Sequence, residues 1–282
     1  MKKQDYDENW YLERTARNHF WLGGKEGQKK VGQMQVAVAG LGGMGSQISE
    51  LLVRAGVRKI RISDPDEIDI SNINRQVIAN SDTVGMPKRT ALEQKLKQIA
   101  PETEIQSFAG VMAENVEQFV DGVDVVVDEI DVFPLKAHLL LHRAARKRKL
   151  PIYSGYVVGM GAHFYKFEGE AFKFEDFIGT MTEDELNHPS AAFLLKKFGY
   201  PLPKYLNESR TKQYHDEVMT GSIPIFGPAT LLGQSLLVTR LLIDFLGEQF
   251  IPFASKTPIM PEFVALDPVD GSYQVHNILD SK

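Results

Sequence analysis

The stretch from Gln35 to Gly45 reads QVAVAGLGGMG and decides the fold. Its first five residues, Gln35 to Ala39, are mostly small or β-branched, which is typical of a buried strand. The next six, Gly40 to Gly45, fit the pattern G-x-G-x-x-G, and a predicted helix from Ser46 to Ala55 follows at once. Such glycines allow a tight turn and let backbone N–H groups approach a phosphate at the helix N-terminus. The stretch therefore predicts a nucleotide-binding α/β fold.

Strand-like and helix-like segments alternate through the rest of the first half of the chain. The expected strands are Lys59 to Ser63, Ile105 to Phe108, Val123 to Val127 and Pro151 to Tyr156, and the expected helices are Pro87 to Ala100 and Leu135 to Arg148. This alternation predicts a Rossmann-like, doubly wound and mostly parallel sheet with helices on both faces.

The second half is expected to add an antiparallel C-terminal extension. The segment Gly161 to Phe174 alternates like a hairpin, and a second hairpin from Glu262 to Ile278 is expected to turn at Asp270-Gly271. A long polar excursion, residues 168–222, is expected between them with one helix near Ser190 to Phe198. The strongest helix of this half is predicted from Pro228 to Gly247.

The composition excludes several classes of protein. The chain has 282 residues, a formal net charge of -5 and no cysteine. An acidic balance disfavours a general nucleic-acid binder, and the lack of cysteine excludes disulfides, thiolate metal sites and a cysteine nucleophile. The polar start, Met1 to Trp10, does not resemble a signal peptide, and apolar runs such as Leu231 to Val238 are too short for a bilayer. We therefore expect a cytoplasmic protein with no membrane partner.

The glycine turn alone leaves NAD, FAD and ATP open as ligands. Asp64, at the end of the next predicted strand, is placed to bind a ribose hydroxyl. The residues after it favour ATP, because Arg75 offers a planar fork for phosphate oxygens and Lys88 offers a point charge at a helix start. A nicotinamide ring gives no reason for clustered cations at this place.

Six motifs in order resemble the ThiF/MoeB/HesA-type superfamily, which includes the adenylation domains of ubiquitin-activating enzymes. They are the glycine loop, D-x-D from Asp64, S-N-x-x-R-Q from Ser71, V-G-x-P-K from Val84, V-V-D-x-x-D from Val126, and, more weakly, Ile223 to Pro228. The close resemblance runs from about Arg14 to Ser154. It implies an N-terminal helical arm (residues 1–30), an adenylation domain (residues 31–282), and ATP with Mg²⁺ as cofactors.

The resemblance also implies a role for each motif residue. The nucleotide-binding set would be Gly40, Gly42, Gly43, Gly45, Asp64, Asp66, Asn72 and Gln76. Arg75 and Lys88 would contact the phosphates, and Asp131 would hold Mg²⁺. Arg17 would be lent to the active site of a partner chain, with Arg14 as a nearby rival.

Each of these residues also has an ordinary structural explanation. Arg75 could pair with Asp66 on the surface, and Lys88 could be a solvated helix residue. Asp131 could cap the helix after Pro134, and Arg17 could lie on a solvated helix face. We prefer function for Arg75, Lys88 and Asp131, while the two interpretations of Arg17 stay open.

The chain departs from many relatives in ways that constrain its chemistry. Those relatives carry a cysteine that captures the activated acyl group and two C-x-x-C pairs for structural zinc, and this chain has no cysteine. Thioester transfer in cis and such a zinc site are therefore excluded. The acyl group would pass directly to an external amine, amide, hydroxyl or thiol, or to a second protein. Val132 also stands where some relatives have asparagine.

The leading hypothesis is an ATP-dependent adenylyltransferase or ligase, acting as a homodimer on a carboxylate or amide of a peptide or small protein. One alternative is an enzyme like the tRNA threonylcarbamoyladenosine dehydratases. The acidic charge disfavours it, although the basic stretch Arg143 to Lys149 keeps it open. A non-catalytic subunit of a heterodimeric activating enzyme and an NAD-dependent oxidoreductase are the remaining alternatives.

Overall fold

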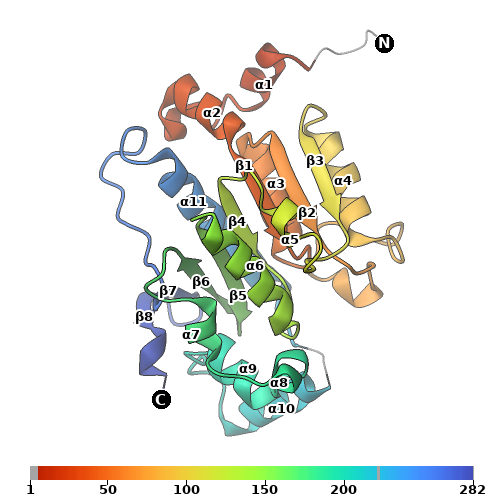
Figure 1. Cartoon of the computed structure of the whole chain (residues 1–282), viewed down its shortest axis with the longest axis vertical. Coiled ribbons are helices and arrows are strands. Elements are labelled where there is room, and N and C mark those ends of the chain that lie inside the picture. Colours follow the sequence, from red (N-terminus) through yellow and green to blue (C-terminus); the bar gives the residue numbers. More distant parts are fainter. Residues whose placement is uncertain (1–5, 221–222, 282) are drawn as a thin grey trace.

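A single eight-stranded sheet forms the centre of the molecule (Figure 1). The computed structural model describes residues 6–220 and 223–281, so the first five residues of the expected arm, residues 221 and 222 of the expected excursion, and Lys282 lie outside it. The strands are β1 (Gln35–Ala39), β2 (Lys59–Ser63), β3 (Glu104–Phe108), β4 (Val125–Asp128), β5 (Ile152–Val158), β6 (Gly161–Phe167), β7 (Glu262–Asp267) and β8 (Ser272–Asn277). Their order in the sheet is β3-β2-β1-β4-β5-β6-β7-β8.

The first five strands are parallel to one another, and β6, β7 and β8 are each antiparallel to the strand before. The Rossmann-like sheet with its antiparallel C-terminal extension is therefore confirmed. The second predicted hairpin is also confirmed, because β7 and β8 pair from Glu262 and Asn277 to Asp267 and Ser272.

Helices cover both faces of the sheet. They are α1 (Glu8–Arg14), η1 (His19–Leu22), α2 (Gly24–Gln33), α3 (Gly45–Ala55), η2 (Ile70–Asn72), α4 (Lys88–Ile99), α5 (Val116–Phe119), α6 (Leu135–Lys147), α7 (Phe174–Ile178), α8 (Glu183–Asn187), α9 (Ala191–Phe198), α10 (Glu208–Met219), α11 (Gly227–Leu246) and η3 (Ile278–Asp280). Strand β1 shows the division, because Val36 and Val38 join the core of α3, α4 and α11, while Ala37 and Ala39 join that of α5 and α6.

Two expectations for the second half were wrong. The expected hairpin at Gly161 to Phe174 is one strand, β6, which pairs with β5. The expected second strand is absent because a helix, α7, begins at Phe174. Its buried residues, Phe174, Phe177 and Ile178, follow the three- and four-residue spacing of one helix face. Residues 168–220, the described part of the excursion, hold four helices, α7 to α10, where one was expected. Three of them begin at capping residues whose side chains accept a backbone N–H, namely Thr182, Ser190 and Asn207.

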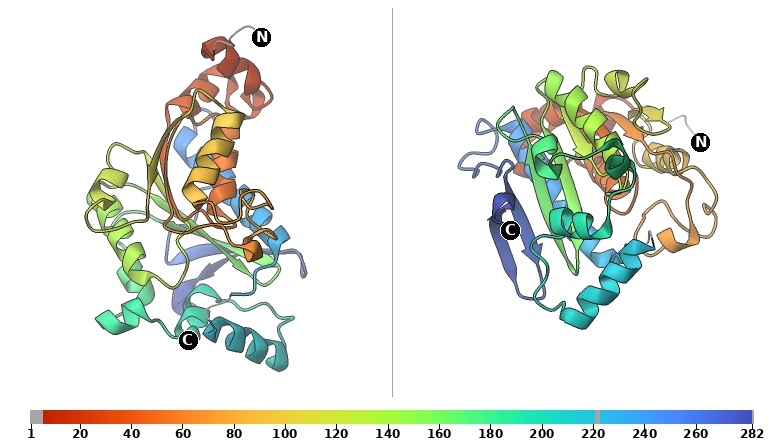
Figure 2. Two further views of the ribbon diagram at one scale, coloured as in Figure 1. Left: turned by 90° about the vertical axis from the view of Figure 1, so that its right-hand side faces the viewer. Right: turned by 60° about the horizontal axis from the view of Figure 1, so that its bottom comes forward.

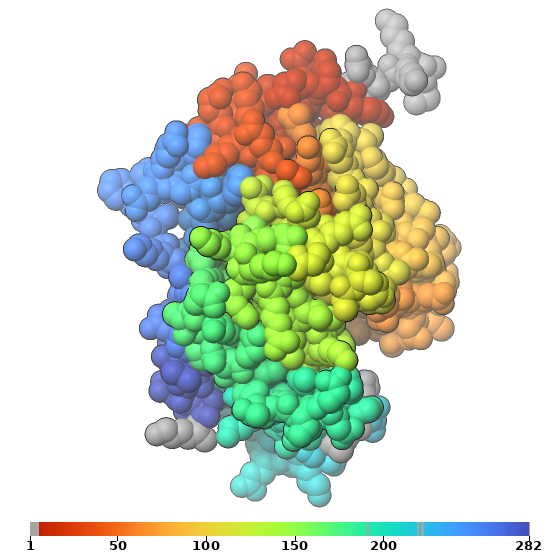
Figure 3. Space-filling view, viewed as in Figure 1, coloured from red at the N-terminus to blue at the C-terminus, as the bar shows by residue number. Residues whose placement is uncertain are grey.

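The arm and the excursion lie at opposite ends of the molecule, as the left view of Figure 2 and the surface in Figure 3 show. The arm packs on the rest of the chain through Tyr11, which is fully buried and lies under the guanidinium of Arg58, 3.5 Å from the ring centre. Arg58 on the domain pairs with Glu8 on α1 at 2.6 Å. The arm is therefore held in place by contacts within the chain.

One helix of the described chain, α11, is long and apolar enough to cross a membrane by length and composition alone. Its most apolar stretch is 50% buried inside the protein. The helix packs on α3, β5 and β6, so its apolar residues supply the core of the sheet.

Buried His163 on β6 gives a prediction for stability. Burial, followed by the nearby His276, lowers the pKa of His163 to about 3, and its Nδ1 lies 3.3 Å from the hydroxyl of Tyr165. In the unfolded chain the imidazole of His163 takes up a proton near pH 6.5, whereas in the folded chain it stays neutral down to about pH 3. Protonation therefore favours the unfolded chain, and the stability present above pH 6.5 is lost as the pH falls towards 3. We expect His163 to remove about 2 kcal/mol of unfolding free energy between pH 7 and pH 5.

Urea unfolding at these two pH values checks this expectation, with His163→Gln as the comparison. The variant should lose less stability on acidification than the native chain, whatever its stability at pH 7. Equal losses in the two proteins would show that His163 does not resist protonation.

Candidate functional site

The carboxyl ends of β1, β2 and β4 converge on one place. The N–H of Gly40 donates to the carbonyl of Ser63 at 2.8 Å, and the N–H of Glu129 donates to the carbonyl of Ala39 at 2.7 Å. Strand β1 lies between β2 and β4. The chain adds β2 and β3 on one side of β1 and then crosses over to add β4 and β5 on the other side. Open α/β sheets bind ligands at such a point. A cavity of about 720 Å³ opens there.

The glycine loop forms one wall of this cavity. Gly40 has φ +87°, and a side chain there would collide with the carbonyl of Glu129. Gly42 and Gly43 line the cavity, and the nearest atom to a Cβ at Gly42 would be 3.9 Å away. Gly45 lies outside the lining, where a Cβ would overlap the carbonyl of Gly40. The loop thus exposes its backbone to a ligand at the start of α3, and Gly45 serves the packing beneath it.

Asp64, Asp66 and Lys88 form a polar group at one side of the cavity. Asp64 accepts the N–H of Leu41 at 2.6 Å and that of Asp66 at 2.9 Å, so it fixes the glycine loop. Burial raises the pKa of Asp64, and Lys88 opposes this rise. Lys88 is itself buried, and its Nζ lies 2.7 Å from Asp66 and 3.9 Å from Asp64. The idea that Lys88 is a solvated helix residue is therefore wrong, and its ammonium has donors left for a phosphate.

Arg75 lies beside the glycine loop and not on Asp66. Its Nη1 donates to the carbonyl of Ser71 and to Oδ1 of Asn74, both at 2.9 Å. The surface pairing of Arg75 with Asp66 is thus absent, since Lys88 holds that carboxylate. Burial lowers the pKa of Arg75, and the charge of Asp131 opposes the shift. The guanidinium therefore lies within electrostatic reach of Asp131.

Asn72 and Gln76 line the cavity next to Arg75. The side-chain carbonyl of Asn72 accepts the N–H of Asp69 at 3.1 Å, which fixes the turn that carries Arg75. In the part of the chain that the structure describes, Oε1 of Gln76 is buried without a hydrogen-bond partner. A buried polar atom of this kind is costly unless a ligand or water satisfies it.

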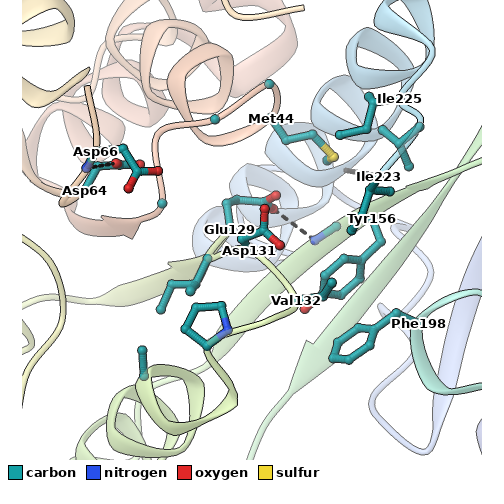
Figure 4. Close-up of a pocket in the computed structure, with 18 of the residues that line it drawn as sticks. Met44, Asp64, Asp66, Glu129, Asp131, Val132, Tyr156, Phe198, Ile223 and Ile225 are labelled. Carbon is teal, nitrogen blue, oxygen red and sulfur yellow. Dashed lines mark hydrogen bonds between the residues drawn. The ribbon is translucent and has the colours of Figure 1, made fainter. Parts of the chain in front are cut away.

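Asp131 projects into the middle of the cavity. Figure 4 shows it beside Glu129, with Asp64 and Asp66 to one side and Met44, Phe198 and Ile225 to the other. The first turn of α6 has no side-chain cap, so the helix-cap explanation of Asp131 is wrong. The exposed carboxylate is available to a ligand.

Glu129 is a cavity residue that sequence reasoning missed. Its Oε1 accepts the N–H of Gly155 on β5 at 2.9 Å. Burial, followed by the charge of Asp128, raises the pKa of Glu129 well above its usual range. The available signal was its place directly after β4, in the same run of residues as Asp131.

A buried group behind Asp131 was also missed. Oδ2 of Asp128 lies 2.6 Å from Nδ1 of His138 and 3.0 Å from Nε2 of His142. Nε2 of His138 lies 3.0 Å from the carbonyl of Asp131. Both partners of His138 are acceptors, so both ring nitrogens donate and the ring is an imidazolium. His138 therefore ties the backbone of Asp131 to α6.

The charges of this group agree with that geometry. Burial alone would lower the pKa of His138, but the contact with Asp128 raises it above the ordinary value. Burial would likewise raise the pKa of Asp128, but His138 and His142 hold it below its usual range. A signal was present in the sequence, because His138 and His142 are four residues apart and share one face of the predicted helix.

These residues fit a magnesium ion that arrives with a nucleotide. Among residues 6–220 and 223–281, no group of three or more His, Asp or Glu side chains forms a metal cage. Mg²⁺ usually needs only one or two carboxylates when substrate phosphates and waters complete its shell. Asp131 is accessible in the cavity, so it can act as that ligand.

The two arginines of the arm differ in their surroundings. Arg14 pairs with Glu102 at 2.6 Å and donates to the carbonyl of Val53 at 3.0 Å, so it is held inside its own chain. Arg17 is exposed after α1 and is not among the residues that line the cavity.

The basic stretch at the end of α6 is largely neutralised. Arg143 and Arg146 pair with Glu175, at 2.9 and 3.1 Å. Lys147 and Arg148 both pair with Glu117. Arg146 also pairs with Glu170 and Arg148 with Asp121, so four carboxylates face the five cations of this stretch and little excess positive charge is left for a nucleic-acid backbone.

The fold and the cavity together define a Rossmann-like α/β protein with cations and carboxylates gathered beside a glycine loop. Residues 13–242 match the ThiF family, and the chain belongs to that family.

Relatives with different functions share part of the chain. It is 37% identical over 174 residues to a tRNA threonylcarbamoyladenosine dehydratase of Bacillus subtilis (strain 168), covering 61% of this chain and 65% of the relative. It is 34% identical over 139 residues to the sulfur carrier protein ThiS adenylyltransferase of the same organism, covering 48% and 41%. The matches thus span less than two thirds of these relatives.

A likeness to a solved structure extends over nearly the whole chain. The structure of E. coli MccB with MccA-N7isoASN has a TM-score of 0.68 at 18% identity and covers 97% of this chain and 73% of that chain. At this identity the likeness establishes the fold alone.

Proposed function

We propose that this protein uses ATP to adenylate a carboxylate or amide of a peptide or small protein, with release of pyrophosphate. The observation that carries the proposal is the convergence of Arg75, Lys88 and Asp131 on one cavity beside the glycine loop. Membership of the ThiF family supports it, since a relative bears the name adenylyltransferase. We also expect the protein to act in the cytoplasm.

The reaction makes a stable carboxylate reactive. A carboxylate oxygen attacks the α-phosphorus of ATP, the bond from that phosphorus to the bridging oxygen breaks, and pyrophosphate leaves with the electron pair. The carboxylate is already ionised, so no general base is required. The protein must align the two reactants and offset the charge that collects on the phosphates.

The residues of the cavity divide this work between them. Gly42 and Gly43 would donate backbone N–H groups to the phosphates, while Arg75 and Lys88 would offset their charge. Asp131 would hold Mg²⁺, which supplies Lewis-acid stabilisation when it is bound. His138 would keep the backbone of Asp131 in place through its 3.0 Å contact.

The activated group must leave the enzyme without a thioester of this chain, because the sequence has no cysteine. An external nucleophile or a second protein would therefore accept it. A peptide or small-protein substrate is suggested by the relative that acts on ThiS and by the MccB structure that contains MccA.

A second candidate is dehydration of threonylcarbamoyladenosine on tRNA. The relative named for that activity, at 37% identity, favours it. The paired basic residues of α6 and the net charge of -5 argue against a large RNA surface. We therefore keep the peptide substrate as the leading proposal.

ATP–pyrophosphate exchange against a substrate panel tests the proposal. The panel should contain carboxylate-bearing peptides, small carrier proteins and tRNA with threonylcarbamoyladenosine, and mass spectrometry should identify the product. Exchange with a peptide or carrier protein supports the leading function, and response to the tRNA alone supports the second. Tight binding of NAD in preference to ATP would instead support an oxidoreductase, and weak ATP binding without exchange would support a non-catalytic subunit.

We further propose that the chain acts as a homodimer that brings Arg17 to the partner's cavity. Phe20 and Trp21 on η1 are 82% and 74% exposed. Phe253 is also fully exposed, in the loop whose Phe250 packs against Gly23 at the end of η1. Exposed aromatic residues gathered on one face favour association with another protein surface.

Mixing two inactive variants tests this arrangement. Arg17→Ala and Asp131→Asn should each lack exchange activity, but a mixed dimer restores one site in which Asp131 of one chain meets Arg17 of the other. With free subunit exchange we expect about a quarter of native activity. A mixture as inactive as its components would contradict the shared site. When Trp21→Asp is added to both variants, it should disrupt the dimer and prevent the recovery of activity.

A further inference from the structure

The cavity has an apolar end that nucleotide binding does not explain. Asp64 and Asp66 mark its polar side, Glu129 and Asp131 lie in the middle, and apolar side chains gather beyond them (Figure 4). This apolar end is lined by Met44, Tyr156, Leu194, Phe198, Val218 and Ile225. Of the charged lining residues, Asp64, Asp66 and Lys88 belong to the polar side and Glu129 and Asp131 to the middle, while Arg75 packs against Gly43.

The wall of the apolar end comes from the excursion. Leu194 and Phe198 lie on α9, Val218 lies on α10, and all three are buried. Phe198 packs edge-on against Tyr156 of β5 with ring centroids 4.8 Å apart. These contacts hold the wall against the sheet, so the apolar end is formed before any ligand enters.

The apolar end adjoins the expected reaction centre. Asp131, the expected magnesium ligand, stands between it and the polar side. The nucleotide would extend from Asp64 through the glycine loop, so a group joined to its α-phosphorus near Asp131 must continue away from Asp64. The apolar end is the part of the cavity that such a group enters.

We propose that the group activated here carries a bulky, uncharged, apolar side chain or acyl chain, which lodges between α9, α10 and Ile225. This inference rests on the proposed function and names its substrate class. A charged chain would lose its hydration at this end without a counter-charge, and a glycine would leave the space unfilled. An aliphatic or aromatic chain would gain by leaving water.

Stable mimics of the acyl adenylate test the inference without knowledge of the natural substrate. We would measure by calorimetry the binding of N-acyl sulfamoyladenosines that differ only in the acyl group: acetyl, 4-methylpentanoyl, 3-phenylpropanoyl, succinyl and 4-aminobutanoyl. The two large apolar compounds should bind about 10–100-fold more tightly than the acetyl compound. The two charged compounds should bind no more tightly than the acetyl compound.

A matched pair of variants places the effect in the cavity. Ile225→Ala removes part of the wall at a partly exposed position, so the fold should survive. The variant should bind the two apolar compounds several-fold more weakly than the native protein does, while its binding of the acetyl compound stays the same. Leu231→Ala truncates an exposed residue of α11 outside the cavity and should change neither.

The outcomes separate this inference from the proposed function. Equal binding of all five compounds, or tightest binding of a charged one, would overturn the apolar substrate and leave adenylation standing. A gain that Ile225→Ala leaves untouched would also overturn it. Failure of all five compounds and of ATP to bind would remove the nucleotide site, and the proposed function with it.

Discussion

The Asp131→Asn variant is expected to lose ATP–pyrophosphate exchange by at least about 10³-fold and to remain folded. The carboxylate lies in the middle of the cavity, where we expect the reacting phosphates to lie. An asparagine keeps the shape but binds Mg²⁺ poorly. The side chain of Asp131 caps no helix, so the substitution removes charge without removing support from α6.

Exchange assays with the native and variant proteins check this expectation, and thermal unfolding confirms the fold. Asp82→Asn is a matched control, because Asp82 is an exposed aspartate outside the cavity. The control should keep native activity. Normal exchange by Asp131→Asn would refute its role in holding the metal, and a large loss of thermal stability would show a structural role instead.

The Asp128→Asn variant should have the largest effect on stability, about 3–5 kcal/mol of unfolding free energy. Asp128 is fully buried and contacts both His138 and His142. An asparagine has no charge, so the imidazolium of His138 would stay buried without its counter-charge. The cost arises because one partner of a buried pair is removed while the other remains.

Urea unfolding at pH 7 measures the loss, and a double-mutant cycle assigns it to the pair. The variant with both Asp128→Asn and His138→Gln should recover part of the stability, since no unpaired charge is left inside. A loss below about 1 kcal/mol, or additive losses in the double variant, would contradict a buried ion pair at this position.

The sequence predicted the parallel part of the fold well because its signals are local. The run from Gln35 to Ala39 is bounded by the glycine turn, and the structure places β1 at these same residues. The excursion was predicted poorly because its helices are only 5 to 12 residues long. Short helices depend on caps and on tertiary packing, and Phe174 buries itself against His138 of α6, far from it in sequence.

The residues of the candidate site also fall into a predicted and an unpredicted group. Gly42, Arg75 and Lys88 belong to ordered motifs, and the structure brings them to one cavity as expected. Glu129 stands at an unspecified position of the V-V-D-x-x-D motif, and His138 belongs to no motif that was considered. Their surroundings arise where β4, β5 and α6 meet, and the contact of His138 with Asp128 joins residues ten positions apart. The sequence alone could not show which residues the tertiary fold would bring together.

A crystal structure of this protein with Mg²⁺ and a non-hydrolysable ATP analogue would show whether the cavity holds a triphosphate. We expect the triphosphate along Gly42 and Gly43, with the cations of Arg75 and Lys88 turned to its oxygens and the metal at Asp131. A nucleotide bound elsewhere, or bound here with those three side chains turned away, would contradict this expectation.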